Sequence, residues 1–130
     1  MKLKINYISI AATDLETSFT FYRDGLGLST HGIKKEPGQH ACFNLGNGLN
    51  LVLYEKKDFL VERGHTMNGN AGTTFTISHN AGSKEEVDNI LQKALCAGAT
   101  QVGSIKAEPW SYAAKFADPD GYEWEIVWEA

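Results

Sequence analysis

The sequence predicts an α+β domain of two βαβββ modules, which form curved, half-open mixed sheets around a cavity and carry their helices on the outside. Two observations lead to this prediction. The order of expected strands and helices in the first half of the chain recurs in the second half, and several strands alternate between apolar and mixed residues. The 130 residues suit a single domain. Module one covers about residues 1–56, a linker about 57–71, and module two about 72–130.

The first module begins with an expected strand at Leu3–Ala12, a short run of β-forming residues. Thr13 and Glu16 have the spacing of a capping box, which predicts that a helix begins there, and Gly25 and Gly27 predict its end. Short runs separated by turn residues then predict three further strands, at Leu28–Lys34, His40–Leu45 and Leu49–Tyr54.

The second module repeats this order. A strand is expected at Thr73–His79, and Ser83 and Glu86 form a second capping box before a helix that ends at Gly98. Three strands are then expected at Gln101–Lys106, Tyr112–Ala117 and Tyr122–Trp128. The last two are joined by Asp118-Pro119-Asp120-Gly121, in which the positions of proline and glycine suit a type I turn.

The strands present two different faces. One alternating set is apolar and is expected to pack under the helices: Ile8, Ile10, Leu49, Leu51, Leu53, Phe75, Ile77, Trp124, Ile126 and Trp128. The opposite set is mixed: Tyr7, Ser9, Asn50, Val52, Tyr54, Thr74, Thr76, Ser78, Glu123, Glu125 and Val127. This mixed set is either the solvent-facing side of an open sheet or the wall of a cavity between two twisted half-sheets.

The bulk properties argue against several classes of protein. A net charge of −4 and a pI near 5.5 disfavour binding to nucleic acid or to an anionic membrane. No apolar run approaches the ~20 residues of a membrane span, and the start of the chain lacks the features of a signal peptide. We therefore expect a cytoplasmic protein in which Cys42 and Cys96 are buried thiols without a disulfide.

Three segments carry a resemblance to a known family. They are residues 14–28, with Asp14-Leu15-Glu16, Phe21-Tyr22 and Gly25-Leu26-Gly27-Leu28; Ala97-Gly98-Ala99; and residues 116–125, around Asp118-Pro119-Asp120-Gly121. In this order and spacing they resemble the vicinal oxygen chelate superfamily, which holds lactoylglutathione lyase (glyoxalase I), bleomycin-resistance proteins, extradiol dioxygenases and fosfomycin-resistance enzymes. The resemblance covers nearly the whole chain. It implies the fold and not one particular reaction.

The resemblance also implies where a metal would bind, since each module of the metal-dependent members contributes two ligands, from its first and last strands. The matching residues here are Tyr7, Val52, Thr74 and Glu125. Only Glu125 keeps the usual residue type, Val52 has no donor atom, and one carboxylate does not hold a divalent cation against water. The four histidines lack the spacing of metal ligands. We expect no metal and no cofactor.

The expected site is a pocket whose ligand-binding residues are Tyr7, Tyr54, Thr74, Trp110, Tyr112 and Glu125. Glu125 is the candidate catalytic residue, because a partly desolvated carboxylate suits a general base. Alternatively, Glu125 only forms a hydrogen bond to Tyr7 or Tyr54 and shapes the cavity. Trp110 and Tyr112 either stack on a planar ligand or are core and dimer-interface residues.

The leading functional hypothesis is a small-molecule-binding protein that resembles the glyoxalase/bleomycin-resistance branch and has a degenerate metal site. The first alternative is a lyase, an isomerase or a dioxygenase-type enzyme of the same superfamily that uses Glu125 as a base or metal ligand. The second is an interaction domain whose concave face is filled by a partner chain. Because superfamily members close their sheets by pairing modules within or between chains, we also expect a homodimer.

Overall fold

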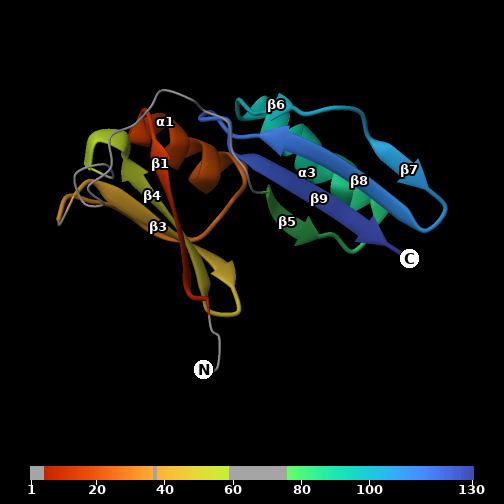
Figure 1. The fold of residues 1–130 in the computed structure, drawn as a ribbon, viewed down its shortest axis with the longest axis horizontal. Coiled ribbons are helices and arrows are strands. Elements are labelled where there is room, and N and C mark those ends of the chain that lie inside the picture. Colours follow the sequence, from red (N-terminus) through yellow and green to blue (C-terminus); the bar gives the residue numbers. More distant parts are fainter. Residues whose placement is uncertain (1–4, 37, 59–75) are drawn as a thin grey trace. The chain divides into compact units, whose positions relative to one another are not determined.

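The computed structural model describes residues 5–36, 38–58 and 76–130 (Figure 1). The chain divides into two compact units, Met1–Asn70 and Ala71–Ala130, and each is described here by itself. Most of the expected linker, about 57–71, and the start of the expected strand Thr73–His79 lie outside the described residues.

The N-terminal unit holds one four-stranded mixed sheet. Its strand order is β1-β4-β3-β2, with β1 parallel to β4 and the other pairs antiparallel. A helical segment follows β1, so the order is βαβββ, as predicted. The elements are β1 (Tyr7–Ala12), α1 (Leu15–Thr20), the π-helix η1 (Phe21–Gly25), β2 (Thr30–Lys34), β3 (His40–Gly46) and β4 (Leu49–Glu55).

The helix α1 begins one residue later than its capping signal suggested. Asp14 is the N-cap, with an extended backbone, and its carboxylate accepts a hydrogen bond from the backbone N–H of Thr17 at 3.4 Å. The expected capping box of Thr13 and Glu16 is therefore wrong, because the aspartate supplies the capping oxygen. A second bond fixes the helix to the sheet: the backbone N–H of Leu15 donates to Oε2 of Glu55 at the end of β4, at 3.3 Å.

The C-terminal unit holds a second mixed sheet, of five strands. Its order is β5-β9-β8-β6, β7 also pairs with β8, and β5 runs parallel to β9. The elements are β5 (Thr76–Asn80), α3 (Lys84–Cys96), β6 (Thr100–Gln101), β7 (Lys106–Glu108), β8 (Ser111–Ala117) and β9 (Glu123–Glu129).

The predicted capping box of the second helix is confirmed. Ser83 is the N-cap of α3, and its hydroxyl accepts a hydrogen bond from the backbone N–H of Glu86 at 3.1 Å. Glu86 reaches back and accepts a bond from the backbone N–H of Gly82 at 2.6 Å. One N–H group of the first turn, that of Glu86, and the N–H group of Gly82, just before the N-cap, are thus satisfied by side chains.

One expected strand, Gln101–Lys106, is divided into β6 and β7. Gln101 lies opposite Phe116 and Lys106 opposite Ala113, so the segment between them is longer than the stretch of β8 that it faces. The extra residues leave the ladder near Gly103, whose φ of 68° suits glycine. These unpaired residues interrupt the hydrogen bonding to β8, so the expected strand is divided into β6 and β7.

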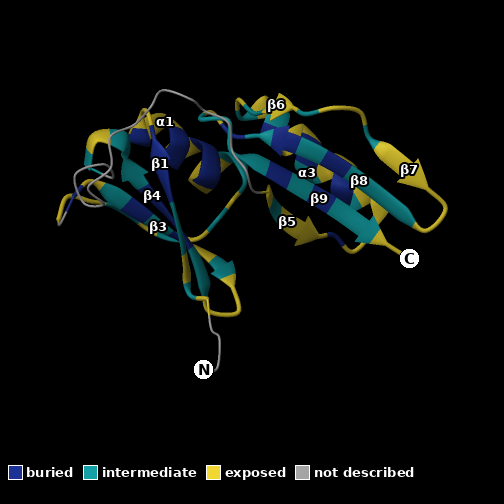
Figure 2. Cartoon of the chain, in the orientation of Figure 1, coloured by how far each residue is buried: buried dark blue, intermediate teal, exposed yellow. Residues whose placement is uncertain are grey.

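The apolar faces of both sheets pack against helices, as predicted (Figure 2). In the N-terminal unit, the ring of Phe43 lies 5.6 Å from that of Phe19 and 5.7 Å from that of Tyr22. In the C-terminal unit, α3 buries Val87, Leu91 and Ala94. The buried residues of the sheets include Ile10, Ala41, Leu51, Leu53, Ala114, Phe116, Trp124 and Ile126.

The predicted fold class is confirmed: each unit is an α+β module with one open mixed sheet and its helices on one face. No helix within the described ranges is long and apolar enough to cross a membrane. The expected burial of both thiols is wrong. Cys96 ends α3 outside the stripe that packs on the sheet and is exposed, and Cys42 is half-buried.

Candidate functional site

The mixed residues of the N-terminal sheet lie on its far face, by which we mean the face turned away from the helices of the same unit. Residues that pair across strands share a face, and so do alternate residues along one strand. The register therefore arranges the far face in three rows across β1, β4 and β3: Tyr7, Asn50 and Asn44; Ser9, Val52 and Cys42; Ala11, Tyr54 and His40.

The centre of this far face is apolar and its two ends differ. Val52 is only 6% exposed and Ala11 is 8% exposed. Burial raises the pKa of the Cys42 thiol, so this side chain stays protonated and uncharged at neutral pH. Tyr7, at one end, is 64% exposed. At the other end the ring of His40 stacks on that of Tyr54, with centroids 5.3 Å apart.

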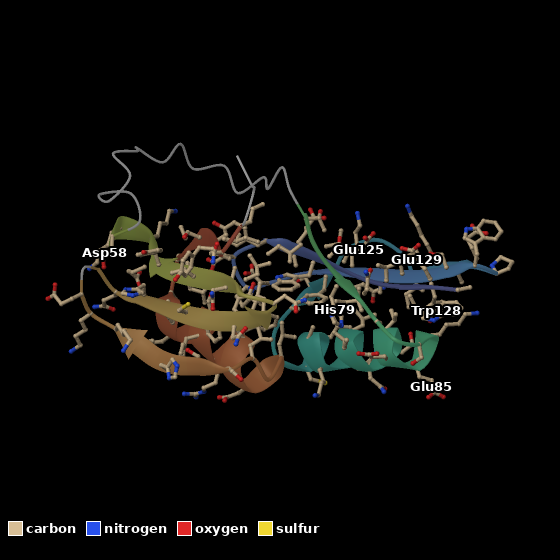
Figure 3. All side chains as sticks on the ribbon, turned by 90° about the horizontal axis from the view of Figure 1, so that it is seen from below. Asp58, His79, Glu85, Glu125, Trp128 and Glu129 are labelled. Atoms are coloured by element: carbon tan, nitrogen blue, oxygen red, sulfur yellow. The ribbon has the colours of Figure 1, made fainter. Side chains whose placement is uncertain are left out.

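The far face of the C-terminal sheet is polar and charged. Its rows across β5, β9 and β8 are Thr76, Glu123 and Ala117; Ser78, Glu125 and Lys115; Asn80, Val127 and Ala113. Figure 3 shows Glu125 and Glu129 on the side of the sheet away from α3, and His79 and Trp128 on the side of the helix. This separation follows from the alternation of side chains along β5 and β9.

Glu125 lies between a hydroxyl group and a cation. The hydroxyl of Ser78 on β5 donates a hydrogen bond to Oε1 of Glu125 at 3.2 Å. On the other side its cross-strand neighbour on β8 is Lys115. Glu125 is half-buried as a residue, but its bond to Ser78 is exposed to solvent, and the carboxylate keeps further acceptor positions. Chemically, the group can accept a hydrogen bond, balance a positive charge or take up a proton.

The structure separates Tyr112 from Glu125. Tyr112 lies opposite Trp128, so it belongs to the face that packs against α3. Its hydroxyl donates a 2.7 Å hydrogen bond to Oδ1 of Asp88 on that helix, and this bond raises the pKa of Tyr112. The signal was present in the sequence, because Tyr112 has the same strand parity as the buried Phe116.

The other expected ligand-binding residues are spread over the two units. Trp110 is 64% exposed and lies between β7 and β8, where its carbonyl oxygen accepts a bond from the backbone N–H of Ala130 at 2.9 Å. Tyr7 and Tyr54 lie on the far face of the N-terminal sheet. Thr74 lies outside the described residues.

Strand register identifies a site residue that the sequence comparison of the modules missed. Ser9 pairs with Val52 in the first module and Ser78 pairs with Glu125 in the second, so these two pairs are equivalent. Two residues before each serine stand Tyr7 and Thr76, which are the same distance in sequence from the N-caps of their helices. Register thus places Thr76, rather than Thr74, at the position equivalent to Tyr7.

The four positions that correspond to the metal ligands of the metal-dependent superfamily members are occupied here by Tyr7, Val52, Thr76 and Glu125. Their side chains do not fit a divalent metal. Val52 offers no donor atom and is buried. Tyr7 and Thr76 offer neutral hydroxyl groups, which are poor substitutes for imidazole at a divalent site, and Glu125 is the one carboxylate. Across residues 5–36, 38–58 and 76–130, no three His, Cys, Asp or Glu side chains form a group that could hold a metal ion.

Solved structures with the same fold are numerous. A glyoxalase-related enzyme from Fulvimarina pelagi is 24% identical, with a TM-score of 0.84, over 97% of this chain and 88% of the other. A lactoylglutathione lyase from Agrobacterium tumefaciens is 25% identical, with a TM-score of 0.68, over 96% and 92%. A fosfomycin resistance protein from Listeria monocytogenes is 17% identical, with a TM-score of 0.74, over 100% and 96%.

Sequence comparison agrees with the fold. No curated protein matches the chain. The family model described as the Glyoxalase/Bleomycin resistance protein/Dioxygenase superfamily matches residues 4–126. The resemblance expected from the sequence is confirmed, and the chain belongs to the glyoxalase/bleomycin resistance protein/dioxygenase superfamily.

Proposed function

We propose that this protein binds a small organic molecule and that Glu125 takes a hydrogen-bond donor or a cationic group of that molecule. The observation that carries the proposal is the position of Glu125, half-buried on the far face of its sheet, with Ser78 donating to one oxygen and Lys115 beside it. A carboxylate held in this way keeps acceptor positions that a hydrogen-bond donor or a cation of a ligand can use. Superfamily membership supports the same function.

The aromatic residues extend this proposal within each unit. Tyr7 and Tyr54 offer apolar surface on the far face of the N-terminal sheet, and Trp110 offers an exposed indole in the C-terminal unit. Aromatic side chains bind planar or apolar groups with little loss of conformational entropy. We leave Tyr112 out of the proposed site, since its hydroxyl is bonded to Asp88 on the helix side.

The second candidate function is catalysis. A lyase, an isomerase or a dioxygenase-type enzyme would use Glu125 as a base or a metal ligand, and the retained carboxylate with its bond from Ser78 favours the base. We prefer binding because the equivalent position in the first module is the buried Val52, which can neither coordinate nor transfer a proton.

The residues at the four ligand positions, of which only Glu125 is a carboxylate, predict that the protein does not depend on a metal. Purified protein should carry less than about 0.2 equivalents of divalent metal, because isolated carboxylates bind such ions weakly. Chelators should leave the melting temperature unchanged, since a resident metal would stabilise the folded state. Elemental analysis and thermal melts with and without EDTA measure both quantities. Stoichiometric zinc, nickel, iron or manganese that requires Glu125 would contradict the prediction.

We also propose that two copies of the chain form a two-fold homodimer, which would bury roughly 1,500 Å² or more. Ile5, Tyr7 and Trp110 are 60%, 64% and 64% exposed, and large apolar side chains on a surface favour association. Sedimentation equilibrium at concentrations on the order of tens of micromolar should give the mass of a dimer. A mass equal to that of one chain would overturn this proposal and leave ligand binding untouched.

A further inference from the structure

The strand β7 (Lys106–Glu108) lies at an edge of the C-terminal sheet. It pairs with β8 on one side, and no described strand pairs with its other side. Figure 2 shows β7 exposed along its whole length. A turn of two residues, Pro109 and Trp110, joins it to β8. An edge of this kind presents backbone groups that another strand can bind.

The register shows which backbone groups of β7 are available. The carbonyl oxygen of Lys115 on β8 accepts a bond from the backbone N–H of Val102 at 2.9 Å. Odd-numbered residues of β8 therefore bond towards β6 and β7, and even-numbered residues bond towards β9. Tyr112 is even-numbered, so Ala107, which lies opposite it, exchanges no bond with β8. The N–H and C=O groups of Ala107 point away from the sheet, and no described residue bonds to them.

The side chains of β7 are complementary to those of a second copy of the same strand. Lys106 and Glu108 flank Ala107 and lie on the far face of the sheet, since they pair with Ala113 and Ser111. If two copies of β7 run antiparallel about a two-fold axis at Ala107, each lysine lies opposite the glutamate of the other copy. Opposite charges directly across a strand pair stabilise it, and the two alanines exchange both of their available bonds.

This order of charges favours a second copy over other extended chains. Charged residues on a short edge strand ordinarily discourage pairing, because like charges would meet. In β7 a lysine and a glutamate stand symmetrically about the residue whose backbone is available, so two-fold pairing is the arrangement in which both charges meet their opposites.

The turn after β7 supports the same partner. Trp110 is 64% exposed, and Ile105, just before β7, is half-buried. Continuing the two-fold register beyond β7 brings Pro109 and Trp110 of one copy next to Ile105 of the other. The exposed indole would then be covered, which adds the apolar area that a three-residue strand lacks by itself.

We propose that β7 pairs with β7 of a second copy, antiparallel and about a two-fold axis at Ala107. The two C-terminal sheets then form one continuous sheet, with two pairs of Lys106 and Glu108 on its far face. This inference rests on the homodimer proposed above and names the surface through which the homodimer forms.

Charge reversal tests the register. Glu108→Lys places lysine opposite lysine across the axis, and Lys106→Glu places glutamate opposite glutamate. Each single variant should raise the dissociation constant of the dimer on the order of tenfold in sedimentation equilibrium. The double variant exchanges the two charges and should regain the dissociation constant of the unaltered chain. An equimolar mixture of the two single variants should also associate, because each chain then meets its complement.

A proline at the axis tests the backbone bonds. Ala107→Pro removes the N–H group that the second copy would bind, and it leaves the bonds to β8 in place because Ala107 makes none of them. It should raise the dissociation constant on the order of tenfold or more. Ala107→Val keeps the N–H group and is the matched control, which should stay within about twofold. Circular dichroism shows whether the variants keep the fold.

The outcomes separate this interface from the homodimer itself. An unaltered chain that sediments as a monomer would overturn both. A dimer that neither single charge reversal weakens would overturn the pairing of β7 and leave the homodimer in place. Weakening in both single variants without recovery in the double variant would also overturn it, since the two-fold register requires that recovery. If Ala107→Pro does not fold, the charge variants decide alone.

Discussion

Replacing Asp118 with alanine should lower the free energy of unfolding by about 2–4 kcal/mol, because it leaves two backbone N–H groups without their charged acceptor. Asp118 is 4% exposed, and its Oδ1 accepts hydrogen bonds from the backbone N–H groups of Asp120 and Tyr122, each at 2.9 Å. The bonds of its own backbone, to Tyr122 and from Gly121, close the same turn. Equilibrium unfolding in urea measures the change.

The matched control is Asp118→Asn. The bonds from Asp120 and Tyr122 go to the same oxygen, and asparagine offers an oxygen at that position, so this variant should lose less than about 1 kcal/mol. Equal losses for alanine and asparagine would mean that the negative charge matters rather than the acceptor. A loss of ligand binding with unchanged stability would contradict the structural role that we assign to this turn.

Replacing Glu125 with glutamine should weaken the binding of a neutral ligand by no more than about 1–2 kcal/mol, roughly tenfold in affinity, since glutamine keeps the shape and an acceptor oxygen for Ser78. Stability should stay nearly the same, because the variant keeps the bond from Ser78 and that bond is exposed to solvent. The ligand is first found by thermal-shift screening of neutral metabolites, and its affinity is then measured by calorimetry with both proteins.

The same variant decides between binding and catalysis. If Glu125 abstracts a proton, glutamine should reduce turnover on the order of 10²–10⁴-fold while affinity stays close to that of the unaltered chain. Glu129→Gln is the control, since Glu129 lies on the same strand and the same face but is exposed. A reaction that disappears in Glu125→Gln and persists in Glu129→Gln would show that the protein is an enzyme.

Local signals along the chain were sufficient to predict the architecture. The recurring order of elements, the capping pair Ser83 and Glu86, and the turn at 118–121 each depend on residues close together in sequence. Caps and turns are satisfied within a few residues, so their hydrogen bonds can be read without knowledge of the sheet. The apolar alternation also predicted which face of β1, β4 and β9 packs under a helix.

The composition of the candidate site depends on register, which short-range signals do not contain. The pairing of β5 with β9 brings Ser78 to Glu125 and makes Thr76 the counterpart of Tyr7, and the pairing of β3 with β4 brings His40 to Tyr54. Tyr112 faces α3 because its strand pairs in one register with β9. A shift of one residue would move each of these side chains to the opposite face, and long-range packing, rather than any local preference, selects the register.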